Sequence, residues 1–288
     1  MNISIGVMCY NEEQNIAQVL NAIINQKEKE VHIDEIIVVS SGSTDRTDEI
    51  VKKIAQKNRR IKLITETKRN GKSKAINIFL REAKNNILVL ESADTLPNDT
   101  TIEILCSRLK NKKVGIVGAR PIPIKTKNKI LSFVVKLQWE LHHLISEEKP
   151  KFGELIAFRK IVKEIPTTAV DEEEIASMIK RKNYELVYEP KAIVFNKGPE
   201  SIREFLRQRR RIYAGHLKLK KKTNYETATL KSMKILSKLF RTKICQRNIL
   251  LTTIAVMLEV IGRSLGVIDY LTKKEHDIWK ISESTKKL

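Results

Sequence analysis

Short apolar runs alternate with amphipathic helical patterns through the first half of the chain. Apolar runs predict strands at 3–9, 35–40, 61–65, 87–90 and 114–118. Helical patterns cover 11–26, 44–57, 72–84 and 98–109, and Asn11 with Gln14 reads as a capping box that begins the first helix. Because single helices separate the strands, parallel pairing with right-handed crossovers is expected. The strands are apolar throughout, which predicts a sheet covered on both faces.

The alternation changes after residue 123. Helical patterns follow at 129–145 and 171–182, strand patterns at 154–158, 185–188 and 192–195, and the chain reads as helical from residue 200 onward. The sequence therefore predicts an α/β fold with a mostly parallel central sheet and a helical C-terminal extension. The expected division is 1–199 and 200–288.

Polar residues follow each of the first four predicted strands. The four segments are Tyr10-Asn11-Glu12-Glu13, Ser40 to Thr47, Lys68-Arg69-Asn70-Gly71-Lys72 and Glu91-Ser92-Ala93-Asp94-Thr95. Each has an ordinary explanation as a helix cap or a turn. In open parallel sheets, however, ligands bind beyond the carboxyl ends of the strands. Helix N-termini there favour anions such as a diphosphate, and a carboxylate can hold a divalent cation that bridges phosphates.

The charge is strongly positive and unevenly distributed. The 288 residues carry a net charge of +21, and segment 197–248 holds 16 Lys and Arg against 3 Asp and Glu. An acidic partner is expected, and nucleic acid, anionic lipid and phosphorylated substrates all qualify. Neither GxxxxGK[ST] nor GxGxxG occurs, which argues against an ordinary NTPase or a dinucleotide-binding protein.

Cysteine usage and the N-terminus favour the cytoplasm. Cys9, Cys106 and Cys245 are far apart in the sequence and form no CxxC spacing, so reduced thiols are expected. The first residues have no basic segment followed by a cleavable apolar stretch, and they read as a strand rather than a signal peptide.

An apolar helical pattern begins at residue 248. Its uncharged run, 248–258, is eleven residues long, shorter than the roughly 20 residues that a bilayer span needs. Glu259 and Arg263 are then spaced for an ion pair within the helix. Two interpretations stay open, a helix docked on the protein and a helix inserted into the interface of an anionic membrane.

Taken in order, several of these segments resemble the signature of family 2 glycosyltransferases with the GT-A fold. The resemblance runs over roughly residues 3 to 215 and rests on Tyr-Asn-Glu-Glu at 10–13, Ser-Gly-Ser-Thr-Asp-Arg-Thr at 41–47, Gly-Lys-Ser-Lys-Ala-Ile-Asn at 71–77, Ala-Asp-Thr-Leu-Pro at 93–97, Asp-Glu-Glu at 171–173 and Gln-Arg-Arg-Arg at 208–211. Asn-Lys-Gly-Pro at 196–199 and Ala-Gly-His at 214–216 resemble archaeal-type members.

The resemblance implies a role for each matching residue. The expected donor-nucleotide contacts are Tyr10, Asn11, Glu13, Ser40, Asp45, Arg69 and Lys72. Asp94 would hold Mg²⁺ or Mn²⁺, and Asp171 or Glu172 would be the general base. The residues implied near the diphosphate and acceptor are Gln208, Arg210 and Arg211.

Three departures from the family pattern bear on these roles. Ser92 replaces the first acid of the metal-binding Asp-x-Asp motif, which leaves one carboxylate. Ile212 replaces the Trp of Gln-x-x-Arg-Trp, which makes processive polymer synthesis less expected. Ser40 and Ser41 stand where acidic residues are usual, which loosens the assignment of the base that is bound.

The expected function is inverting, metal-assisted sugar transfer from a nucleotide-diphosphate sugar to a hydroxyl of a glycan or a lipid-linked acceptor. A nucleic-acid-binding protein is one alternative, with 203–222 as its footprint, but aromatic residues make up only 5% and no recognition motif occurs. A non-catalytic nucleotide-sugar-binding protein is another, motivated by Ser92 and Ile212. A nucleotidyltransferase ranks low, because no Gly-rich phosphate loop follows the first strand.

Overall fold

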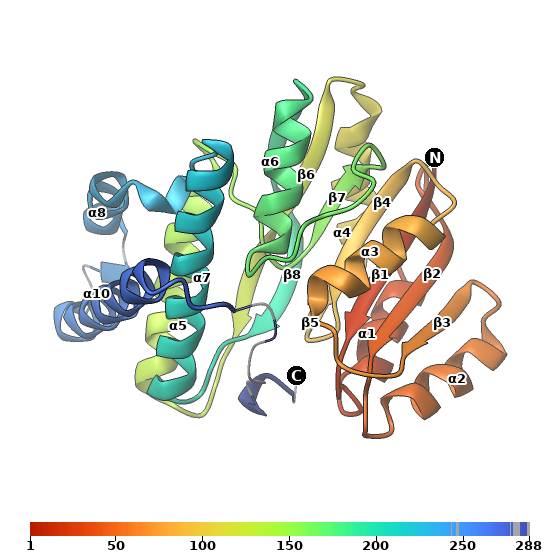
Figure 1. The fold of residues 1–288 in the computed structure, drawn as a ribbon, viewed down its shortest axis with the longest axis horizontal. Helices are drawn as coiled ribbons and strands as arrows, with labels where there is room; N and C mark the ends of the chain where they lie inside the picture. Colours follow the sequence, from red (N-terminus) through yellow and green to blue (C-terminus); the bar gives the residue numbers. More distant parts are fainter. Residues whose placement is uncertain (243, 246–247, 277, 279–282, 287–288) are drawn as a thin grey trace.

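The computed structural model describes residues 1–242, 244–245, 248–276, 278 and 283–286. Its centre is an eight-stranded sheet in the order β3-β2-β1-β4-β7-β6-β8-β5 (Figure 1). The strands are β1 (Asn2–Cys9), β2 (His32–Ser41), β3 (Ile61–Glu66), β4 (Ile87–Ser92), β5 (Thr95–Pro97), β6 (Val114–Ile124), β7 (Ile156–Arg159) and β8 (Glu185–Lys197).

Parallel pairing dominates the half of the sheet that carries the predicted ligand site. β1 pairs in parallel with β2 and β4, and β2 pairs in parallel with β3. β7 is antiparallel to both β4 and β6, β6 and β8 are parallel, and the short β5 is antiparallel to β8. The predicted α/β fold with a mostly parallel sheet is confirmed.

Helices cover both faces of this sheet. Against one face pack α1 (Ile16–Ile24), α2 (Thr47–Lys57) and α4 (Thr101–Ser107), and against the other pack α3 (Lys72–Glu82) and α6 (Asp171–Arg181). Each helix packs through an apolar face. In α1, for example, the buried residues recur at helical spacing as Ile16, Val19, Leu20 and Ile23. The expected two-sided covering of the sheet follows from this packing.

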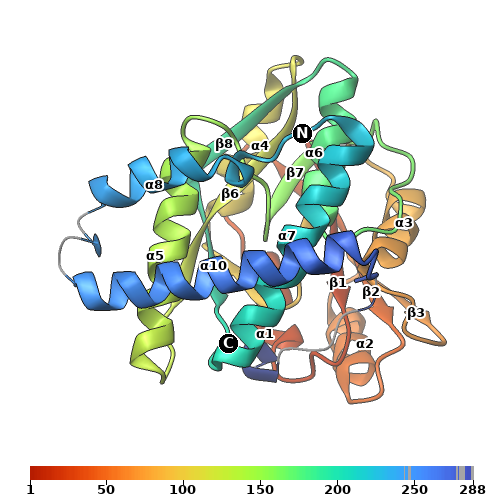
Figure 2. The same cartoon turned by 60° about the vertical axis from the view of Figure 1, so that its left-hand side comes forward.

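Four further helices form a separate group beside the sheet (Figures 1 and 2). They are α5 (Lys129–Ser146), α7 (Ile202–Thr223), α8 (Ser232–Arg241) and α10 (Ile249–Leu271), and they share a small apolar core. Figure 2 shows α10 running across α5 and α7. The helix α10 is 23 residues long, longer than its uncharged run suggested. By length and composition it is the one helix among the described residues that could cross a membrane.

Several predicted boundaries are wrong for identifiable reasons. Asn11 is not a helix cap: its φ of 51° places it in the left-handed region, and α1 begins only at Ile16, after Asn15. The predicted strands 185–188 and 192–195 form the single strand β8. Tertiary contacts decide both cases. Asn11 bonds to the loop after β2, and β8 pairs with β6 on both sides of a register shift between Tyr188 and Ile193.

A glycine at the centre of the sheet provides a test of this packing. A Cβ on Gly6 would lie 2.6 Å from the ring of Phe79, whereas a Cβ on Gly153 would meet nothing within 4 Å. Gly6→Ala should therefore destabilise the fold by about 1–3 kcal/mol through overpacking, and Gly153→Ala should not. Urea unfolding of both variants measures the difference; equal midpoints would contradict the close approach of α3 to β1.

Candidate active site

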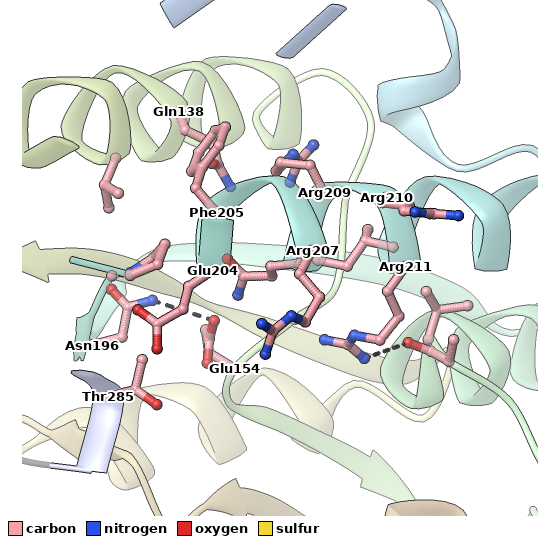
Figure 3. Close-up of a pocket in the computed structure, with 18 of the residues that line it drawn as sticks. Gln138, Glu154, Asn196, Glu204, Phe205, Arg207, Arg209, Arg210, Arg211 and Thr285 are labelled. Carbon is pink, nitrogen blue, oxygen red and sulfur yellow. Dashed lines mark hydrogen bonds between the residues drawn. The ribbon is translucent and has the colours of Figure 1, made fainter. Parts of the chain in front are cut away.

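One cavity of about 890 Å³ lies at the carboxyl ends of β1 and β4. Its wall also includes the first residues of α3 and α6 and side chains of α5, α7 and α10. Figure 3 shows Arg207 and Arg211 of α7 pointing into it, near Glu154. The cavity therefore occupies the position where open α/β sheets bind their ligands.

The loops after β1 and β2 bind one another beside this cavity. The backbone N–H of Thr44 donates to Asn11 Oδ1 at 2.8 Å, and the N–H of Asn11 donates to Ser43 Oγ at 3.1 Å. The N–H of Glu13 donates to Asp45 Oδ2 at 3.1 Å. Asn11, Glu13 and Asp45, which the sequence predicted as donor contacts, thus hold the two loops together and do not line the cavity.

Three of the seven predicted donor residues do line the cavity: Tyr10, Arg69 and Lys72. The guanidinium carbon of Arg69 lies 4.2 Å from the centroid of the Tyr10 ring, a cation–π contact. Ser40 is fully buried below the loop, where its hydroxyl bonds to Ser43 at 2.8 Å, and Ser41 reaches the cavity instead. An aromatic ring and a cation at this edge suit a nucleobase and a phosphate.

The predicted acid pair at the start of α6 is held by the start of α3. Lys72 Nζ donates to Glu172 Oε1 at 2.6 Å, and Ser73 Oγ donates to Asp171 Oδ1 at 2.6 Å. Burial raises the pKa of Asp171 to about 6. Burial also opposes ionisation of Glu172, but the Lys72 ammonium outweighs it and lowers the pKa of Glu172. The pair thus divides into an ionised Glu172 and a more readily protonated Asp171.

Three further carboxylates, those of Glu12, Glu91 and Glu154, lie near Asp94. Burial, and then the charge of Asp94, raises the pKa of Glu12 to about 8 and that of Glu154 to about 7. Burial holds the pKa of Glu91 well above its ordinary value; Thr95 donates to one of its oxygens, and the other has no partner within the described chain. This concentration of acids is arranged to receive positive charge.

The donor set around Asp94 is compatible with a divalent cation that also binds donor phosphates. Across the residues described, no group of three His, Cys, Asp or Glu side chains is placed to hold a metal by itself. Asp94 lines the cavity and makes no hydrogen bond or ion pair within the same residues. Mg²⁺ is commonly bound by one or two carboxylates together with substrate phosphates and water, so a single free carboxylate suffices.

The basic segment of α7 divides by helical position. Arg209 donates two hydrogen bonds of 2.8 Å to Glu259, and Arg210 pairs with Asp269, both acids of α10. Arg211 donates to the carbonyl of Ala169 at 3.0 Å near Asp171 and Glu172, and Gln208 lines the cavity. Gln208, Arg210 and Arg211, all predicted near the diphosphate, thus line the cavity, and of the three Arg210 is also paired with an acid of α10.

Many residues of the cavity wall were not predicted from the sequence, among them Glu12, Glu154, Arg207 and Lys286. Arg207 precedes Arg211 by one helical turn, so the helical period of 203–222 was the available signal. The C-terminal turn η3 (Glu283–Lys286) lies at the end of β1, where Lys286 Nζ donates to the carbonyl of Tyr10 at 2.7 Å and pairs with Glu12. No sequence pattern connects Lys286 with Glu12, since 274 residues separate them.

A mostly parallel sheet with a phosphate-suited, acid-rich cavity at its strand ends defines a protein with the GT-A fold of nucleotide-diphospho-sugar transferases. The chain belongs to glycosyl transferase family 2, whose model matches residues 4–184. Poly-beta-1,6-N-acetyl-D-glucosamine synthase of Staphylococcus epidermidis is 27% identical over 221 residues, which cover 72% of this chain and 52% of that protein. The chain thus spans about half the length of this relative. The resemblance to family 2 is confirmed.

Solved structures share the fold. The mannosyltransferase PcManGT of Pyrobaculum calidifontis, in complex with GDP-Man and Mn²⁺, superposes with a TM-score of 0.69 at 21% identity and covers 95% of this chain and 88% of its own. Glucosyl-3-phosphoglycerate synthase of Mycobacterium tuberculosis, with Mn²⁺, UDP and phosphoglyceric acid, has a TM-score of 0.55 at 18% identity and covers 75% and 78%. At these identities the similarity establishes the fold.

The raised pKa of Glu154 predicts a pH-dependent stability. Because the folded pKa of about 7 lies above the ordinary 4.5, the protonated group stabilises the fold fully below pH 4.5, and this stabilisation is lost as the pH rises through about 7. Glu154→Gln should therefore reduce the fall in melting temperature between pH 5 and about pH 8. Glu200→Gln, a matched change of an acid that pairs with Lys197, is the control and should alter the fall less than Glu154→Gln does. Parallel pH profiles for wild type and Glu154→Gln would contradict the burial of Glu154.

Proposed function

We propose that this chain transfers a sugar, with inversion, from a nucleotide-diphosphate sugar to a hydroxyl group of a glycan or a lipid-linked acceptor. The observation that carries the proposal is the Lys72–Glu172 ion pair, which lines the same cavity as Asp94. It puts a potential proton acceptor and a phosphate-binding cation side by side. Membership of family 2 supports the reaction class, and the GDP-Man and UDP complexes of the structural neighbours support the donor class.

Residues at the ends of the strands would bind the sugar donor. Tyr10 and Arg69 would receive the nucleoside, and Lys72 would contact the diphosphate together with the start of α3. A Mg²⁺ or Mn²⁺ ion on Asp94 would neutralise charge on the leaving diphosphate. The Mn²⁺ of two neighbours supports this cofactor, and the free carboxylate of Asp94 supports its place.

Glu172 is the better candidate for the general base. Its side chain is 13% exposed in the cavity wall, whereas Asp171 is 2% exposed and accepts a hydrogen bond from Ser73. When the donor diphosphate takes part of the Lys72 charge, the pKa of Glu172 rises toward that of an effective base. The acceptor oxygen then attacks the anomeric carbon, its proton passes to Glu172, and the bond to the diphosphate oxygen breaks.

The cations of α7 belong to the diphosphate and acceptor side of this proposal. Arg207 and Arg211 stand one helical turn apart and point into the cavity (Figure 3), and Gln208 lines the same cavity. In this scheme, residues 1–199 form the transferase domain and 200–288 form an extension that completes the acceptor side. The matches at 196–199 and 214–216, and an archaeal neighbour of the same fold, support an archaeal-type member.

Two alternatives receive less support. For nucleic acid, Arg209 and Arg210 would have to leave the acids of α10 with which they pair, so the basic segment offers fewer cations than its sequence implies. For a non-catalytic binding protein, the acid pair of α6 would have no role in the cavity. The proposed location is the cytoplasm, at the inner face of the cell membrane.

Donor binding is the first prediction of this proposal. Melting temperatures with GDP-mannose, UDP-glucose or UDP-N-acetylglucosamine should rise for one nucleotide only, and more with Mn²⁺, because a ligand at 100 times its Kd stabilises the native state by about 2.7 kcal/mol. Asp94→Ala should lose the Mn²⁺-dependent part, and Asp99→Ala, at an acid that pairs with Lys27 on the surface, should keep it. Absence of a shift with every nucleotide would contradict the transferase function.

The role of Glu172 is tested by turnover. Glu172→Gln should lower kcat by about 10²- to 10⁴-fold and leave donor affinity equal or stronger, because Lys72 loses a competitor for the diphosphate. Glu174→Gln, on the same helix but outside the cavity, is the matched control. The rate is release of nucleoside diphosphate in the presence of a membrane extract. An unchanged kcat in Glu172→Gln would shift the base to Asp171.

A further inference from the structure

The helix α10 has its charged residues turned toward the protein and most of its large apolar residues exposed. Its three charged side chains all face the protein, where Glu259 bonds to Arg209 and Arg263, and Asp269 pairs with Arg210. At Gly262, a Cβ would lie 2.7 Å from Arg209 Cβ, so the backbone of α10 approaches α7 closely. A surface helix in water shows the opposite arrangement.

The outward side of α10 and the exposed side of α8 both carry apolar side chains, here called the apolar surface. Eleven of the fourteen exposed large apolar side chains in the described residues lie on these two helices. Met257 is 58% exposed, Phe240 is 66% exposed and Leu250 is 71% exposed. A concentration of this kind indicates a partner that removes the surface from water.

Basic residues border this apolar surface. Lys231, Lys234 and Arg241 are exposed on and before α8, and Lys273 and Lys274 are exposed just beyond the end of α10. Juxtaposed exposed lysines would repel each other in a symmetric contact between two copies of the chain, whereas anionic lipid headgroups would attract them. Charge thus favours a bilayer over a second copy.

The orientation of α10 favours lying on the bilayer over crossing it. Ion pairs at Glu259 and Asp269 hold the helix against α7, in which nine of 22 residues are Lys or Arg. A helix as basic as α7 cannot accompany α10 through hydrocarbon. With one face held by α7 and the other apolar, α10 has the form of an interfacial helix.

The cavity of the active site reaches the underside of this surface. Besides Asp94 and Glu172, its wall includes apolar side chains from all four helices of the group: Leu137, Leu141, Phe205, Leu236, Ala255 and Val256. These six side chains form an apolar arm of the cavity, and an apolar arm does not suit a polar nucleotide sugar. It suits a hydrocarbon chain whose polar head reaches the acid pair.

We propose that the outer face of α8 and α10 docks on the surface of an anionic bilayer, and that the apolar arm takes the hydrocarbon chain of the acceptor from it. The acceptor is then a membrane lipid that presents a hydroxyl on its head group. This assignment of the acceptor rests on the proposed transferase function, whereas the docking surface does not.

Docking is tested with purified full-length protein and vesicles. Vesicles of phosphatidylcholine with phosphatidylglycerol should bind the protein at low salt, more weakly at high salt, and more strongly than phosphatidylcholine alone. The double variant Met257→Glu/Ile261→Glu should lower the partition coefficient at least about tenfold. The matched double variant Gln56→Glu/Asn86→Glu adds the same charge at exposed positions away from α8 and α10 and should change it less than about twofold.

Three outcomes would overturn the docking proposal. They are no binding of wild type to either vesicle, equal loss in both double variants, and a dimer in sedimentation that Met257→Glu/Ile261→Glu dissociates in the absence of vesicle binding. A donor-induced rise in melting temperature that persists in both variants shows that they are folded. It also separates failure of docking from failure of the proposed function.

The apolar arm is tested with alkyl glucosides below their micelle concentration. Dodecyl glucoside should bind wild type at least about tenfold more tightly than methyl glucoside, because only the former buries a chain. Ala255→Trp, and to a lesser degree Ala255→Leu, should remove this preference by filling the arm while donor binding is kept. Equal affinities of the two glucosides for wild type, or a preference unchanged by Ala255→Trp, would overturn the assignment of the arm.

Discussion

The ammonium group of Lys72, in the wall of the cavity, is the charge on which the acidic site depends. Carboxylates of Glu12, Asp94, Glu154 and the α6 pair line one cavity. Burial raises the pKa of Glu12, Glu154 and Asp171. Lys72 keeps Glu172 ionised at 2.6 Å, and Arg211 lies close to the same acids. A site with this excess of carboxylates suits a bound cation, and a donor diphosphate would share the Lys72 ammonium with Glu172.

A second set of charges joins the site to the helices beside the sheet. Arg209 and Arg210 bind α10, and their neighbours Arg207 and Arg211 face the cavity, so one helix connects the two regions. Because the α7–α10 contact is made by paired charges and a close glycine, the apolar side of α10 is left outside. The position of the proposed acceptor route therefore follows from the arrangement of charges on α7.

Much of the fold was predictable because local patterns and tertiary structure agree in the sheet. Buried strands such as β1 and β4 are apolar throughout, and the segments after them are polar. Boundaries failed where distant contacts outweighed local preference, as at Asn11, whose side chain bonds to the loop after β2. Four of the seven expected donor residues, Asn11, Glu13, Ser40 and Asp45, likewise proved to support the loops, because hydrogen bonds between loops cannot be read from a single segment.

By itself, the sequence determined the α/β class, the edge of the sheet that carries the site, and the presence of Asp94 and Lys72 at that edge, whereas the acid pair of α6 was implied by the resemblance to family 2. Hydrophobic periodicity and the ends of parallel strands are local properties, so they can be recognised in the sequence alone. Only the tertiary structure decided that Arg210 pairs with Asp269 of α10, that Lys286 pairs with Glu12, and that the charged residues of α10 face the protein. Each of these depends on which distant charge a side chain meets, and that is settled by packing rather than by sequence spacing.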